Sequence, residues 1–243
     1  MRLHLFAFVL LGASAGHAQS TNQESSAKHW WLGAQVSPDV AYRTLYLIEH
    51  NSTTEAIVDA RDRSEVPRLA LTAQLFAGRT LNKRFSMELG LGYALRGWQV
   101  DVSTLTYGDP LDPRRGFIYE SADDVGPILE ELHYLIMPVR AVCTLGNGRL
   151  RSISSLGFSA DLLFQAYHIS VINGERTKTE QDGYATFNIT PTASTGIAYT
   201  LGARGELRAQ PTFSYGALNI RTDDPIGGRL WNAGLVFGYT RRL

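Results

Sequence analysis

Residues 183–203 read GYATFNITPTASTGIAYTLGA and form the longest stretch without a charged side chain beyond the N-terminal segment. Five threonines and Pro191 make this stretch a poor helix. With a period of two it separates into an apolar and a polar face, which indicates a strand. The apolar face holds Phe187, Ile189, Pro191, Ala193, Thr195, Ile197, Tyr199 and Leu201. The opposite face holds Thr186, Asn188, Thr190, Thr192, Ser194, Gly196 and Thr200.

The same alternation recurs in seven other segments of the chain. They are 30–37, 68–78, 85–96, 134–144, 155–165, 206–215 and 231–242. Most have about the length that a tilted membrane strand needs, whereas no stretch after the N-terminal segment has the 18 apolar residues of a spanning helix. The sequence therefore predicts eight strands.

The connections between these strands alternate between short and long. Short connections with turn residues lie at 80–83, 146–149 and 202–205. Longer connections are expected at 41–67, 99–131, 170–182 and 219–228. This succession predicts an all-β, eight-stranded antiparallel up-and-down barrel with its long loops at one end.

The composition of the two faces decides which one points outward. The apolar face carries almost no charge and has aromatic residues near strand ends, at Trp30, Tyr199 and Tyr239, as the interfacial girdles of membrane barrels do. The other face is rich in Gly, Ser and Thr, which suits a narrow interior. We therefore expect a transmembrane β-barrel with its apolar face in lipid. The alternative is a soluble lipocalin-like ligand-binding barrel with that face inside.

The N-terminus predicts export. A basic start, an apolar run and small residues indicate a signal peptide over 1–18, cleaved after Ala15 or Ala18. Residues 19–29 are expected to be a periplasmic lead-in, and 30–243 an outer-membrane β-barrel. The predicted localisation is the cell outer membrane. Because 23 Lys and Arg balance 23 Asp and Glu, we expect no nucleic-acid partner, and the single cysteine excludes an intrachain disulfide framework.

Near the C-terminus, Asn232, Gly234, Phe237 and Tyr239 resemble the β-signal read by the barrel assembly machinery, which implies that machinery as a partner during biogenesis. Segments 90–97, 132–139 and 212–219 resemble the PorT-type outer-membrane β-barrel domain family, a small porin-like barrel of the OmpA/OmpX kind. This likeness covers about residues 30–243. It implies the architecture and, for some members, a role accessory to secretion, but no catalytic residues.

Charged residues on the inward-facing parity form the main candidate site. They are Glu88, Arg96, Arg140, Asp161, Glu206 and Arg208. In a narrow interior such charges must pair, because an unpaired buried ion is costly. We interpret them as a structural network that plugs the barrel, and a narrow gated pore is the alternative.

Two histidines are candidates for chemistry. His168 and Ser170 share the lipid-facing parity and are spaced as in lipid A deacylases of the PagL kind, but Val171 departs from that motif and no acidic orienter is identifiable. His133 lies near Glu130 and Glu131, and we interpret it as a solvated residue near the start of a strand. We therefore expect no catalysis, no metal and no cofactor.

The expected role is structural or an interaction at four external loops. The expected partners are outer-membrane lipid and a protein or ligand at those loops. Asn51, in the first loop, matches a glycosylation sequon and is interpreted as an ordinary polar loop residue.

Overall fold

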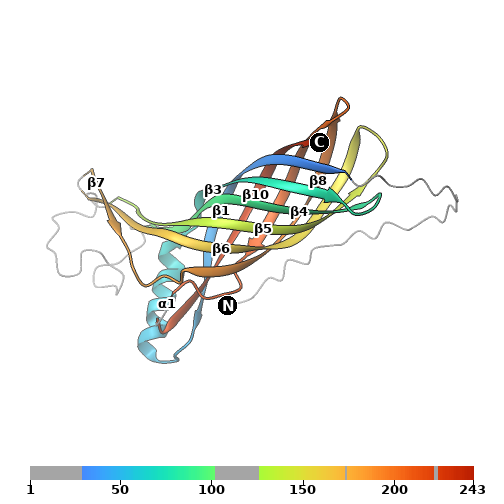
Figure 1. Cartoon of the computed structure of the whole chain (residues 1–243). Helices are drawn as coiled ribbons and strands as arrows, with labels where there is room; N and C mark the ends of the chain where they lie inside the picture. The colour runs from blue at the N-terminus through green and yellow to red at the C-terminus, as the bar shows by residue number, and fades with distance from the viewer. Residues whose placement is uncertain (1–28, 102–125, 173, 222–223) are drawn as a thin grey trace.

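The computed structural model describes residues 29–101, 126–172, 174–221 and 224–243. The predicted signal peptide lies outside these ranges. Within them, eight long strands form a closed antiparallel ring in which each strand pairs with its neighbour along the chain and the last pairs with the first (Figure 1). The ring consists of β1 (Trp30–Leu47), β3 (Arg68–Thr80), β4 (Phe85–Val100), β5 (Ile128–Leu145), β6 (Leu150–Ile172), β8 (Phe187–Leu201), β9 (Gly205–Tyr215) and β10 (Ile226–Arg242). The predicted up-and-down barrel is confirmed.

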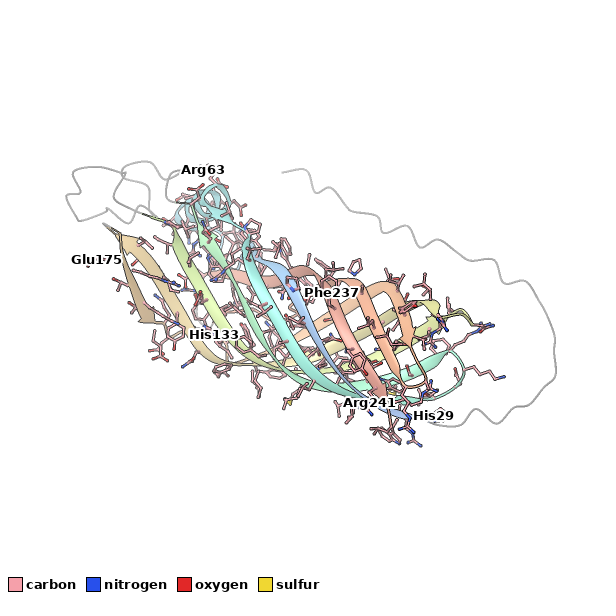
Figure 2. The ribbon with its side chains drawn as sticks, turned by 90° about the horizontal axis from the view of Figure 1, so that it is seen from above. His29, Arg63, His133, Glu175, Phe237 and Arg241 are labelled. Carbon is pink, nitrogen blue, oxygen red and sulfur yellow. The ribbon has the colours of Figure 1, made fainter. Side chains whose placement is uncertain are left out.

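The two ends of the barrel differ. Tight turns at 81–84, 146–149 and 202–204 lie at one end, which we call the turn end. The other end, the loop end, carries α1 (Ser52–Ser64) and two short strands, β2 (Glu65–Val66) and β7 (Glu175–Glu180). In Figure 2, His29 and Arg241 mark the turn end, and Arg63 and Glu175 mark the loop end.

At the loop end the strands run further than the sequence pattern predicted. β1 continues to Leu47, and β6 continues to Ile172, where β7 pairs with it as an added edge strand. The predicted loop 41–67 is therefore wrong, since it contains the end of β1, the helix and β2. Asn51 is the N-cap of α1, because its side chain accepts a hydrogen bond from the backbone N–H of Thr54 at 2.9 Å. It is thus a capping residue rather than an ordinary loop residue.

The apolar face points outward. Leu89, Phe158, Phe213 and Phe237 come from four different strands, and their side chains are 43–62% exposed. The other strands also present large apolar side chains on the outside, among them Leu32, Leu75, Leu135 and Ile197. An apolar belt around the whole circumference suits lipid rather than water, so the chain is a transmembrane β-barrel. The soluble arrangement with the apolar face inside is wrong.

Within the described ranges, no helix combines the length and the apolar character that crossing a membrane requires.

A β-bulge divides β6 into two parts. His133 of β5 pairs with Gln165, but the next residue of β5, Tyr134, pairs with Leu163, so Phe164 has no partner. One extra residue reverses the side-chain parity beyond it. Consequently the even-numbered positions of β6 point inward after Phe164, whereas the odd-numbered positions do so before it.

Candidate functional site

The barrel interior is the candidate functional site, and it contains all six charged residues that the sequence singled out. Four of them meet near the turn end. Glu88 forms an ion pair with Arg140, with Nη2 and Oε2 3.0 Å apart, and a second ion pair with Arg208. Nε of Arg208 donates to Glu206 at 2.8 Å, and Arg151 binds the same carboxylate. We call these five residues the turn-end network.

The remaining two charges form a separate cluster further along the barrel. Nη1 of Arg96 lies 2.6 Å from Oδ2 of Asp161, which has no exposed surface. The hydroxyls of Ser159 and Thr190 also donate to Asp161. In the amide orientation that satisfies both of its polar atoms, Asn232 accepts from Nε of Arg96 at 3.2 Å. The six predicted charges therefore form two clusters and not one network.

Besides Arg151 of the turn-end network, further charged residues of the described interior were missed, among them Arg43, Glu65 and Asp39. Arg43 and Glu65 form a bidentate ion pair at the loop end, with Nε and Oε2 2.8 Å apart. The guanidinium carbon of Arg43 lies 3.7 Å from the ring centroid of Trp98. Asp39 accepts from Thr72 at 2.6 Å. The alternation of β1 continues through Asp39 and Arg43, and this signal could have placed both inside.

Apolar side chains close the interior above these charges. A buried cluster comes from the four strands β4, β5, β6 and β10 and from the segments before β8 and after β9. Its members are Ala94, Trp98, Leu132, Tyr134, Ile136, Ala166, Tyr184, Ile220 and Leu230. Between this cluster and the turn-end network lies a cavity of about 60 Å³, which has room for a few water molecules. The interior is thus packed with side chains, as is typical of small barrels.

His168 points inward, so the prediction of a lipid-facing histidine is wrong. The bulge at Phe164 reverses its parity and brings Nδ1 within 2.8 Å of Oε1 of Glu130. The other carboxylate oxygen of Glu130 accepts from the hydroxyl of Tyr184 at 3.1 Å. This cluster lies on the loop-end extension of the barrel. No hydrogen bond joins His168 and Ser170 among the described contacts, so the pair lacks the link of an activated nucleophile.

Two pKa values in this cluster are shifted. The hydrogen bond that Nδ1 of His168 donates to the carboxylate of Glu130 raises the pKa of His168, against the opposing effect of burial. Burial raises the pKa of Tyr184 to about 12, and the nearby charge of Glu130 adds to that effect. Near neutral pH Tyr184 is therefore a neutral hydrogen-bond donor to the carboxylate.

His133 lies on the outside of the barrel with other rings. Its Nδ1 is 2.7 Å from the hydroxyl of Tyr93, and its ring contacts Phe164 and Tyr167. Oε2 of Glu131 is 3.7 Å from Nε2 of His133. In the described part of the chain, no group of three or more His, Cys, Asp or Glu residues could hold a metal ion.

The residues of the predicted assembly signal lie on β10 and alternate between the two faces. Asn232 is buried inside, whereas Phe237 and Tyr239 are exposed on the outer surface. A Cβ at Gly234 would overlap Oδ1 of Asp39 on the neighbouring strand. Glycine therefore has a packing role at this position, independent of any recognition of the signal.

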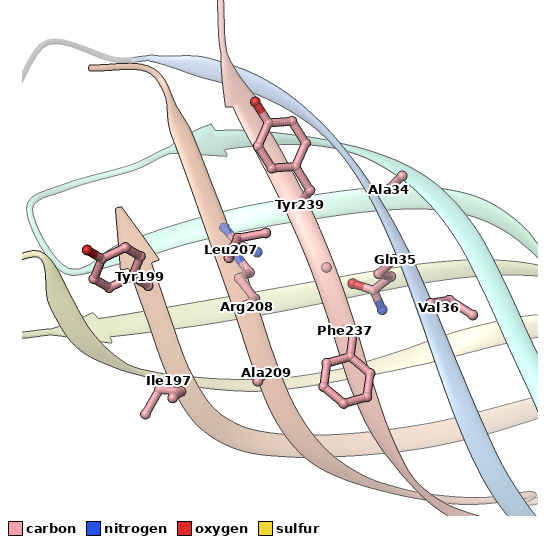
Figure 3. A pocket seen from close by; sticks show the side chains of 11 residues that line it. Ala34, Gln35, Val36, Ile197, Tyr199, Leu207, Arg208, Ala209, Phe237 and Tyr239 are labelled. Carbon is pink, nitrogen blue, oxygen red and sulfur yellow. The ribbon is translucent and has the colours of Figure 1, made fainter. Parts of the chain in front are cut away.

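An apolar groove of about 560 Å³ runs along the outside near the turn end (Figure 3). Its lining includes small residues such as Ala34 and Ala209 and the aromatic side chains of Tyr199, Phe237 and Tyr239. These aromatic side chains belong to the lipid-facing belt. The groove is therefore part of the membrane surface.

No protein-family model and no curated protein matches this sequence. Among solved structures, the chain is similar to Neisserial surface protein A, with 11% identity, a TM-score of 0.46, and coverage of 88% of this chain and 97% of that one. It is also similar to the outer membrane protein OprG from Pseudomonas aeruginosa, with 11% identity, a TM-score of 0.44, and coverage of 88% and 96%. For the outer membrane protease OmpT from Escherichia coli the values are 8%, 0.41, 88% and 97%. We assign neither a family nor an activity from these likenesses.

Proposed function

We propose that this chain is an outer-membrane β-barrel protein with a structural or interaction role and no catalytic activity. The observation that carries the proposal is an apolar belt around a barrel whose interior is closed by packed side chains. A closed interior leaves the ends of the barrel as the places where function can reside. The PorT-type resemblance implies a role accessory to secretion, and such a role is one kind of interaction at the barrel ends.

The loop end is the proposed outer, partner-binding face. It carries α1 and the β6–β7 extension, whereas the described connections at the turn end are tight turns (Figure 1). Bacterial outer-membrane barrels place short turns in the periplasm and longer loops outside. The predicted signal peptide and C-terminal signal support the same location, with the barrel assembly machinery as the partner that inserts the chain.

Cysteine labelling tests this orientation directly. Cys143 is the single cysteine of the chain and is first replaced by alanine. Glu175→Cys then places a thiol at the loop end, and Asn147→Cys places one in a tight turn at the turn end. With a membrane-impermeant maleimide, we expect Glu175→Cys to be labelled in intact cells and Asn147→Cys only after the outer membrane is permeabilised. Labelling of Asn147→Cys in intact cells would contradict the orientation.

Gel migration tests the barrel itself. A closed transmembrane barrel held by continuous strand pairing is expected to stay folded in SDS without heating and to migrate differently after boiling. Identical migration before and after boiling would argue against a membrane barrel.

Unchanged lipid A after overexpression would in addition exclude the deacylase alternative, which the inward position of His168 already disfavours.

A further inference from the structure

The interior opens at the turn end into a polar cavity that the proposed role does not use. This cavity, the turn-end vestibule, has a volume of about 360 Å³ and is bounded by the turn at 81–84, the start of β9 and the end of β10. Its size lies at the lower end of the range for small-molecule sites. Figure 2 shows the end of the barrel at which it lies, marked by His29 and Arg241.

The charge lining this vestibule is strongly one-sided. Its lining includes six cationic side chains: Lys83, Arg84, Arg151, Arg204, Arg208 and Arg242. The single carboxylate in the lining, Glu206, is already bound by Arg151 and Arg208. Among the described residues, none of the other four cations forms an ion pair. Such an excess of positive charge in a concave site concentrates anions.

The vestibule also has hydrogen-bond donors without acceptors. Nε of Arg151 and Nε1 of Trp31 are both enclosed and have no acceptor among the described groups. Both residues line the vestibule. Enclosed donors without a partner are uncommon in folded proteins and call for an acceptor. The site is therefore rich in donors and poor in acceptors, which favours a ligand with several acceptor oxygens.

We propose that the turn-end vestibule binds a phosphate group, carried either by a lipid headgroup or by a small soluble molecule. A phosphate group offers several acceptor oxygens, and arginine guanidinium groups bind it in a bidentate manner. Arg84 and Arg204 are exposed and form no ion pair with another described residue, so their side chains can turn toward such a group. The indole of Trp31 provides an apolar surface beside the cations for the remainder of the ligand.

Calorimetry with sodium pyrophosphate on the full barrel in an uncharged detergent at low salt tests this site. The double variant Arg84→Gln and Arg204→Gln removes two vestibule cations. Because each charge-assisted hydrogen bond contributes substantially to binding, we expect the variant to bind at least about tenfold more weakly. The matched control is Arg149→Gln with Arg241→Gln, which removes two exposed charges at the same end that do not line the vestibule. The control should keep wild-type affinity.

Two competitors identify the source of the phosphate. Displacement of pyrophosphate by dihexanoylphosphatidylglycerol at lower concentrations than glycerol 3-phosphate supports a lipid headgroup, and the reverse order supports a soluble phosphate ester. Absence of pyrophosphate binding by the wild type would overturn the proposal. An equal loss of pyrophosphate affinity in both double variants would also overturn it, because binding would then depend on the overall surface charge. Heat-modifiable migration of every variant verifies that the barrel is folded.

Discussion

Asp161 shows how strongly the stability of the barrel can depend on the partner of one buried charge. Its carboxylate is fully buried, pairs with Arg96 and accepts from two hydroxyls. Replacing one member of a buried pair leaves the other as an uncompensated charge, which costs about 3–5 kcal/mol of stability. The same reasoning applies to Glu88, which two arginines share.

We therefore expect Asp161→Asn to lower the free energy of unfolding by about 3–5 kcal/mol in urea titrations of the detergent-solubilised barrel. Asp182→Asn is the matched control, since Asp182 is exposed and outside the strands. The control should change stability by less than about 0.5 kcal/mol. Equal effects of the two substitutions would show that the interior pair contributes no more than a surface charge.

We expect the stability contributed by His168 at the loop end to depend on pH. Its hydrogen bond with Glu130 raises its pKa above the ordinary value of 6.5. A raised folded-state pKa contributes stability that is fully present below the unfolded pKa, and this stability is lost as the pH rises through the folded value. NMR titration should give His168 a pKa above 6.5, and Glu130→Gln should lower it. Glu131→Gln, which removes a charge next to His133 instead, should change it less. A Glu130→Gln variant with an unchanged pKa would contradict the assignment.

At the scale of elements, the alternation of apolar and polar residues correctly predicts which side chains point outward over the membrane-facing parts of all eight strands. It failed at the loop end for two reasons. The bulge at Phe164 inserts one residue with no local sequence signal, so the parity of His168 was predicted incorrectly. The helix α1 was also missed, although Asn51 and Thr54 form a capping box at its start.

The N-cap of α1 allows a prediction about the local stability of this helix. Asn51→Ala removes the acceptor for the N–H of Thr54 and should destabilise the helix by about 1 kcal/mol. Hydrogen exchange of the amides in the first turns of α1 should become about fivefold faster, because exchange there follows local opening. Ser52→Ala, the neighbouring exposed position, is the control and should leave exchange almost unchanged. The urea midpoint of the barrel should be the same in both variants.

At the scale of the whole molecule, the packed interior predicts that the barrel does not conduct ions. The apolar cluster around Trp98 and Tyr134 closes the loop-end half, and the turn-end network joins β4, β5 and β9 across the interior above the vestibule. In planar bilayers we therefore expect no stable conductance steps from the wild type. Steps that change on Glu88→Gln but not on Glu175→Gln, an exposed control on β7, would instead support the narrow pore.

The sequence by itself determined how many strands cross the membrane and, apart from the part of β6 beyond the bulge, which of their side chains face lipid. It could do so because each strand residue meets either the bilayer or the interior, and this choice is made locally with a period of two. Only the tertiary structure decided which charges meet. Glu88 and Arg208 are 120 positions apart, and Arg96 and Asp161 are 65 apart. Ring closure, strand stagger and one bulge bring such residues together, and these are properties of the closed barrel as a whole.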